Sequence, residues 1–272
     1  MFQLILTIVL ISAGFSVNSA NATSSLLDAD FWHDGKAELN LYEARRFHYG
    51  RLYQSSVRHF LVKESFNIKD LVKSNKSEGK DIISVIKLNQ VTSTQTGTYR
   101  YEQMHSCFWS KSKGDLLKFS LSHHEACGLS FKEGLFRNGQ WHLLAKTYWD
   151  GQAHVESQLK PKGTVWFYEE LPLRARLLVA DKQGAPEDLK IVHPMTHSKA
   201  GSFTPQNATI SIEGMKVTLN WNGNEDILVF KSEWPHPLAS WKRPNGESLE
   251  LTKTLRLDYW NRHAPGDEAL LE

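Results

Sequence analysis

Residues that could hold a metal ion gather in one short stretch of this sequence. The stretch contains His123-His124-Glu125 and Cys127, and His105 stands a little earlier. Imidazole, thiolate and carboxylate are groups that bind zinc in proteins. Successive residues of a β-strand point to opposite faces, however, so His123 and His124 cannot bind one ion without a bulge. No His-Glu-x-x-His or Cys-x-x-Cys motif accompanies them, so we interpret the stretch as the polar end of a strand and expect no metal.

A second stretch with catalytic residue types lies near the start of the chain. The run Phe31-Trp32-His33-Asp34-Gly35-Lys36 places a base, an acid and a cation in a row. Hydrolysis there would need a nucleophile from another part of the chain, and no Gly-x-Ser-x-Gly elbow occurs. We favour the structural interpretation, in which an aromatic anchor precedes an Asp-Gly turn into the first strand.

A hydrolase nevertheless remains an alternative function for this chain. It would use either His33 and Asp34 or the group His123, His124 and Glu125. These groups would have to converge on one cleft and have perturbed pKa values. We expect them instead to lie apart on the outer face of the sheet. No catalytic residue is therefore assigned, and no cofactor is expected.

The first 22 residues are predicted to be a signal peptide and not part of the fold. An apolar run over residues 2–17 precedes Ala20-Asn21-Ala22, a small-x-small site of the kind that signal peptidases cleave. The run is too short to span a membrane comfortably, and no later stretch reaches the roughly 20 apolar residues that a span needs. We therefore predict a secreted protein of the bacterial periplasm or cell envelope, with an uncleaved anchor as the alternative.

Both cysteines belong to a predicted β-hairpin. An aromatic arm leads to a break at Gly114-Asp115, and residues 117–121 then alternate between apolar and polar side chains. In an exported protein two cysteines most simply form one disulfide, so we expect Cys107 to be joined to Cys127. Two unpaired buried thiols are the alternative.

Short alternating segments continue through the rest of the chain. Residues 141–149 and 152–159 flank Asp150-Gly151, a dipeptide that is preferred in tight hairpin turns. Further strands, separated by Gly, Pro and Asn turns, are predicted between residues 208 and 257. Only residues 166–178 show near-helical spacing, with Pro172 allowed in a first turn.

These elements predict a mainly β fold. We expect a single domain over residues 23–272, in which a strongly curved antiparallel sheet forms a half-open barrel and the short helix covers it. A two-sheet sandwich is the alternative. About 250 residues after the signal suffice for a sizeable core. The net charge of +2, without a dense basic block, argues against a nucleic-acid partner.

The tryptophans suggest a binding function. A curved sheet around one helix often leaves an apolar hollow, and tryptophan or tyrosine side chains could line it. The candidates for ligand contact are Trp141, Tyr148, Trp149 and Trp166. The competing interpretation is that these side chains only pack the core.

Several segments of the chain resemble a group of exported bacterial proteins of unknown function, often mislabelled "septum formation inhibitor Maf". The resemblance covers nearly the whole mature chain and is carried by Phe31-Trp32-His33-Asp34-Gly35-Lys36-Ala37-Glu38, Tyr49-Gly50, Ile86-Lys87-Leu88-Asn89, Thr96-Gly97-Thr98-Tyr99-Arg100-Tyr101, Glu125-Ala126-Cys127-Gly128, Tyr148-Trp149-Asp150-Gly151 and Leu257-Asp258-Tyr259-Trp260. True Maf pyrophosphatases open with a Ser-Pro-Arg-Arg motif, which this sequence lacks. Members of the resembled group tend to have an aromatic residue where Ala126 stands here.

The resemblance implies a fold similar to that of the open-barrel lipoprotein and lipid carriers of the bacterial envelope. It implies no catalytic residues, and fold alone does not fix function. We expect a non-enzymatic envelope protein that binds an apolar ligand, a lipid or an acyl chain, on its concave face. A scaffold that meets another envelope protein through that face fits the sequence almost as well.

Overall fold

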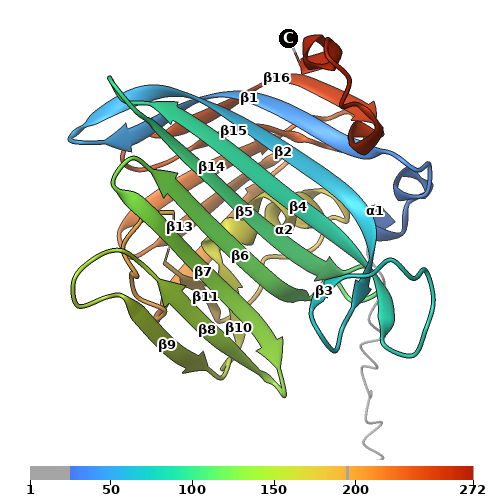
Figure 1. Ribbon diagram of the computed structural model, residues 1–272. Coiled ribbons are helices and arrows are strands. Elements are labelled where there is room, and N and C mark those ends of the chain that lie inside the picture. The colour runs from blue at the N-terminus through green and yellow to red at the C-terminus, as the bar shows by residue number, and fades with distance from the viewer. Residues whose placement is uncertain (1–24, 194–195, 272) are drawn as a thin grey trace, which may run out of the picture.

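The computed structural model describes residues 25–193 and 196–271, and most of its regular structure is β-strand (Figure 1). Within these residues 16 strands form one sheet, with β10 at one edge and β9 at the other. The strands are β1 (Ala37–His48), β2 (Arg51–Asn67), β3 (Val72–Lys73), β4 (Ile82–Gln95), β5 (Arg100–Ser110), β6 (Leu116–Glu125), β7 (Gly128–Arg137), β8 (Gln140–Lys146), β9 (His154–Leu159), β10 (Thr164–Phe167), β11 (Leu189–Val192), β12 (Pro205–Glu213), β13 (Lys216–Trp221), β14 (Asn224–Phe230), β15 (Leu238–Lys242) and β16 (Ser248–Leu257). The α-helices are α1 (Ser25–Asp28) and α2 (Leu171–Ala180), and single 3-10 turns are Asp30–Trp32, Tyr168–Glu170, Tyr259–Asn261 and Asp267–Leu271.

The order of the strands joins two meanders into one sheet. Neighbouring strands are antiparallel except β10 and β11, which are parallel and are connected through α2. A parallel pair requires such a crossover. β1 pairs with β16, so the first and last strands lie side by side within the sheet. The predicted curved antiparallel sheet with one short helix is confirmed, and the sheet does not close.

The predicted hairpin around the cysteine region is present as β5 and β6. Met104 pairs with Ser122 and Cys107 with Phe119 across it. Along β6 the buried residues alternate with more exposed ones, as expected for a strand with one face toward the core. The alternation buries His123 and exposes His124.

The expected disulfide between Cys107 and Cys127 is wrong. Both thiols are free; Cys107 is buried in β5 and Cys127 is exposed in the turn after β6. Because Cys107 lies opposite Phe119, reaching the end of β6 requires six further residues, roughly 20 Å at about 3.4 Å per residue. A disulfide needs Cα atoms within about 7 Å.

The second predicted hairpin, β8–β9, forms with a wider connection than expected. Lys146 pairs with His154, so Asp150-Gly151 lies inside a longer loop and does not form a two-residue turn by itself. Gly151 takes the positive φ of 68° that its position suggested. The extra residues of the loop include Tyr148 and Trp149, which become available to a site.

Helix α2 begins later than predicted and lies inside the molecule. Trp166 and Phe167 end β10, and the helix starts at Leu171 with Pro172 in its first turn. Leu173 packs in the core with residues of β4–β8, whereas the opposite side of the helix packs with residues of β13–β16. Eight of its ten residues are buried, so α2 is a central core element.

One ion pair and one hydrogen-bonded network connect this helix to the sheet. The guanidinium of Arg176 donates to both carboxylate oxygens of Glu38 in β1, at 2.9 and 2.7 Å. The Nε of Arg174 donates to Glu170 at 2.7 Å, and Glu170 also accepts from Nε1 of Trp109 at 3.1 Å. Paired charges of this kind can be buried because each has its hydrogen-bond partner.

The predicted signal peptide lies outside the described residues. Among residues 25–193 and 196–271, no helix has the length and apolar character needed to cross a membrane.

Candidate functional site

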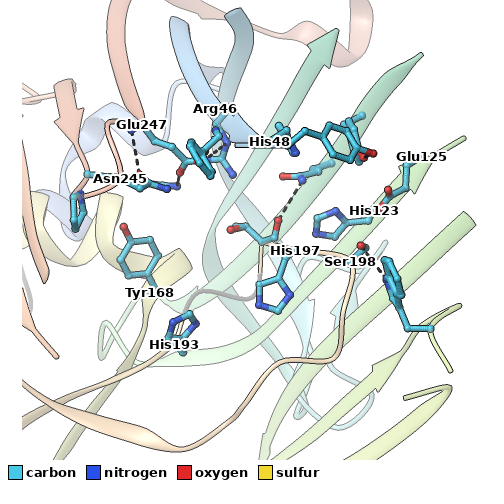
Figure 2. A pocket seen from close by; sticks show the side chains of 18 of the residues that line it. Arg46, His48, His123, Glu125, Tyr168, His193, His197, Ser198, Asn245 and Glu247 are labelled. Atoms are coloured by element: carbon cyan, nitrogen blue, oxygen red, sulfur yellow. Dashed lines mark hydrogen bonds and ion pairs between the residues drawn. The ribbon is translucent and has the colours of Figure 1, made fainter. Parts of the chain in front are cut away.

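A cavity of about 520 Å³ lies where strand ends and hairpin turns from both halves of the sheet converge. Its walls come from the ends of β1, β5, β6 and β13, the turns after β8 and β15, and the segment that follows β11. Figure 2 shows Arg46 and Glu247 on one side of this space and His123 with Glu125 on the other. Helix α2 is buried between the two core clusters, and this cavity lies beyond it at the end of the sheet.

Two arginines and one glutamate form a buried charged group in the wall. Arg46 lies at the end of β1 and faces inward, whereas its neighbour Arg45 is exposed. Glu247, in the turn before β16, accepts from Nη1 of Arg243 at 2.8 Å and from the backbone N–H of Phe47 at 2.9 Å. The Nε of Arg46 is 3.6 Å from Glu247, an ionic contact that is too long for a hydrogen bond.

Arg46 therefore keeps free hydrogen-bonding capacity in a buried position. Only 3% of the residue is exposed, and neither its Nε nor its Nη1 has a hydrogen-bond partner among the described residues. Burial, followed by the charge of Arg243, lowers the pKa of Arg46 to about 10, so the guanidinium stays charged at neutral pH. Burial would raise the pKa of Glu247, but the two arginines and the N–H of Phe47 lower it to about 2.

Asp226 holds the aromatic part of this wall in place. The buried carboxylate accepts hydrogen bonds from Nε1 of Trp221 at 2.7 Å, from Nε1 of Trp241 at 2.9 Å and from the hydroxyl of Tyr168. The guanidinium of Arg243 stacks over the Trp241 ring, 4.1 Å from its centroid. These contacts fix the ring positions before any ligand arrives.

Histidines supply most of the remaining polar groups. His123 is 1% exposed, and its Nε2 has no hydrogen-bond partner among the described residues. Burial, with the nearby Lys132, lowers the pKa of His123 to about 3 and that of His197 to about 4. Burial also lowers the pKa of His48. These rings are therefore neutral at pH 7 and can each donate and accept a hydrogen bond.

The rim of the cavity is aromatic. Tyr148 and Trp149 stack with ring centroids 5.1 Å apart, and Trp149 Nε1 donates to the hydroxyl of Ser198 at 3.1 Å. Nζ of Lys199 lies 4.8 Å from the Trp149 ring centroid. Gly128 makes room for Tyr148, since a Cβ there would lie 2.6 Å from its ring.

The four aromatic residues named from the sequence divide into two pairs. Tyr148 and Trp149 line the cavity. Trp141 is buried against Phe119 and Phe167 in the core, and Trp166 is buried among the residues of the second core cluster. Trp141 and Trp166 therefore pack the core, as the competing interpretation proposed.

The two possible catalytic groups do not meet. His33 Nδ1 contacts Nζ of Lys63 at 3.1 Å, and Asp34 pairs with Arg256; neither lines the cavity. His123 and Glu125 do line it, so the expectation that they lie on the outer face is wrong for both.

His124 is exposed, as the argument from strand alternation required. Among residues 25–193 and 196–271, no three His, Cys, Asp or Glu side chains are placed to hold a metal ion together.

The charged residues of the wall, Arg46, Arg243 and Glu247, were not predicted from the sequence. An arginine at an inward position, between buried Ala44 and half-buried His48 in the alternation of β1, is the signal that could have revealed Arg46. Arg243 and Glu247 lie in a turn, where charged residues are normally solvated, so nothing in their own sequence marked them.

Comparisons of the chain with protein families, with curated proteins and with solved structures found no match.

Proposed function

We propose that this protein binds a small amphiphilic molecule in the cavity at the end of its sheet. The observation that carries the proposal is a preformed space of about 520 Å³ whose walls combine aromatic rings with convergent charged and polar groups. Ligand sites in proteins have this size and combine apolar and aromatic side chains with polar groups that orient the ligand. The apolar or ring-shaped part of the ligand packs against Tyr148, Trp149 and Trp221.

The position of α2 restricts the kinds of ligand that can bind. Because the helix fills the concave interior, a long chain cannot lie along that face without unfolding the core. The acyl chain or lipid expected from the sequence is therefore accommodated at the sheet end, between the aromatic residues. This arrangement suits a single-chain molecule better than a bulky two-chain lipid.

A fluorescent fatty acid, 11-(dansylamino)undecanoic acid, tests the proposal by titration. We expect saturable binding at one site per chain, with the dansyl emission shifted to shorter wavelength. Trp149→Ala removes one wall and should weaken binding about tenfold, equal to about 1.4 kcal/mol. Trp260→Ala is the matched control, because Trp260 is also exposed but does not line the cavity.

Binding that is absent, or that is equally strong in the Trp149→Ala variant, contradicts the proposal. Native mass spectrometry of the protein purified from its own envelope gives an independent result. A co-purifying amphiphile supports the binding function, whereas a stoichiometric protein partner supports the scaffold alternative.

A further inference from the structure

The buried charged wall indicates which end of a ligand enters the cavity. Arg46 holds an ionised guanidinium in a position where two of its N–H-bearing nitrogens, Nε and Nη1, have no acceptor among the described residues. Leaving buried charged donors unpaired is costly, and a folded protein rarely does so without a use for them. Arg46 lines the cavity, so an anionic acceptor placed there meets its positive charge, although Nε and Nη1 themselves are not exposed to the open space.

The neighbours of Arg46 do not provide that acceptor. Glu247 is the nearest carboxylate, but its oxygens already accept from Arg243 and from the N–H of Phe47. Arg243 likewise has one unpartnered nitrogen, its Nε. The two guanidiniums thus share one carboxylate at the cavity wall.

We infer that the head of the ligand is an oxyanion, a carboxylate or a phosphate, bound by Arg46 with the help of Arg243. This inference rests on the proposed function for the apolar part of the ligand. Planar guanidinium groups bind such heads through paired N–H···O bonds. Glu125 lines the opposite side of the cavity and repels an anion there, so the head is directed toward Arg46 (Figure 2).

Three probes with the same twelve-carbon chain test the inference by isothermal titration at pH 7.5: dodecanoate, dodecyl phosphate and dodecan-1-ol. We expect each anion to bind at least tenfold more tightly than the alcohol, the value of about one charge-assisted hydrogen bond. The tighter of the two anions identifies the kind of head. Arg46→Gln should remove the preference for anions and leave the affinity for the alcohol unchanged.

Arg45→Gln is the matched control, since it removes the same side chain one residue away on the exposed face and should change nothing. Equal binding of all three probes, with no effect of Arg46→Gln, overturns the inference and leaves the proposed function standing.

A probe without an alkyl chain distinguishes a failure of the oxyanion inference from a failure of the proposed function. Inorganic phosphate, compared with potassium chloride at equal ionic strength, should raise the melting temperature of the natural protein and of the Arg45→Gln variant but not of Arg46→Gln. If no twelve-carbon probe binds and phosphate still stabilises through Arg46, the oxyanion site holds and the amphiphile proposal fails. If phosphate stabilises Arg46→Gln as well as the natural protein and no anionic probe is preferred, the oxyanion site is refuted.

Discussion

Arg46 is a residue whose position is hard to explain by stability alone. Its guanidinium is buried, makes one long ionic contact and leaves hydrogen-bond donors unpaired. An unsatisfied buried polar group costs about 1–3 kcal/mol. Residues that break a local rule in this way are expected at functional sites.

The first prediction follows from that cost. Arg46→Gln should leave the free energy of unfolding of the ligand-free protein unchanged or raise it by about 1 kcal/mol, because Glu247 keeps Arg243 and the N–H of Phe47 as partners. Glu247→Gln should instead lower it by about 3 kcal/mol, since two buried guanidiniums then lose their shared carboxylate. Urea denaturation at pH 7.5 measures both. A large loss in Arg46→Gln would show that this arginine serves the fold.

The second prediction concerns the contribution of Glu247 to stability at low pH. The pKa of Glu247 is about 2 in the folded protein, below the value of about 4.3 expected in the unfolded chain. Its stabilising contribution is therefore complete above about pH 4.3 and is lost as the pH falls toward 2. The loss of stability of the natural protein over this range should be smaller in Glu247→Gln. Denaturant titrations at steps between pH 5 and pH 2 check this, and equal slopes would contradict it.

At the scale of elements, α2 holds the two halves of the sheet together. Its two sides pack into different core clusters, and Arg176 pairs with Glu38 at the start of β1. The ion pair is almost completely buried, with side-chain exposures of 3% and 0%. Each charge can be buried only because the other is present, so removing one partner should destabilise the fold strongly.

The third prediction tests the dependence of Glu38 and Arg176 on each other. Glu38→Gln should lower the free energy of unfolding by about 3 kcal/mol or more, because it leaves the Arg176 charge buried without its counter-ion. Glu38→Leu combined with Arg176→Met should recover most of the loss. The coupling energy from the double-mutant cycle, measured in urea, should be favourable for the pair. Additive losses would mean that the two side chains act independently.

The fourth prediction concerns the hairpin β5–β6 and its cysteines. In the native protein a thiol reagent should modify Cys127 alone, because Cys127 is exposed and Cys107 is buried. A second thiol should react only after denaturation, without a reducing agent. Cys127→Ser should abolish the native reaction, with Cys107→Ser as its control. If neither thiol reacts in denatured, unreduced protein, Cys107 and Cys127 form a disulfide after all.

How far the sequence predicts this fold depends on the range of the interactions involved. Alternation within β6 and the turn residues near Gly114 give the hairpin correctly, because strand and turn preferences are local. The same hairpin register places Cys107 opposite Phe119, so counting residues from the turn already argues against the disulfide. The start of helix α2 was predicted too early, at residue 166. The apolar residues of β10 precede the helix, and a short apolar strand cannot be distinguished from a helix by its spacing alone.

The site was harder to predict than the strands. Tyr148 and Trp149 were found through their residue types, whereas Arg46 and Glu247 come together only through the pairing of β1 with β16. That pairing joins the two ends of the described chain, and no local signal specifies it. Register across such distances decides which side chains meet at the cavity.

At the scale of the whole molecule, burial keeps several histidines neutral. Burial lowers the pKa of His59 and His197 to about 4 and that of His105 and His123 to about 3. In the unfolded chain the same rings have a pKa of about 6.5. Between these values the unfolded state binds protons that the folded state does not.

The last prediction follows from this difference in proton binding. Stability should be complete above about pH 6.5 and should fall as the pH is lowered toward 4, with up to about 1.4 kcal/mol per pH unit from each buried histidine. His105→Gln should reduce the slope, because the Nε2 of His105 is buried without a partner among the described residues. His124→Gln is the control, since His124 is exposed on the other face of the sheet and should leave the slope unchanged. Urea denaturation at pH 7.5, 6.0, 5.0 and 4.0 gives the slopes. A stability that stays constant from pH 7.5 to pH 4.0 would mean that water or movement of the chain solvates these rings, and the cavity walls would then be less rigid than their hydrogen bonds indicate.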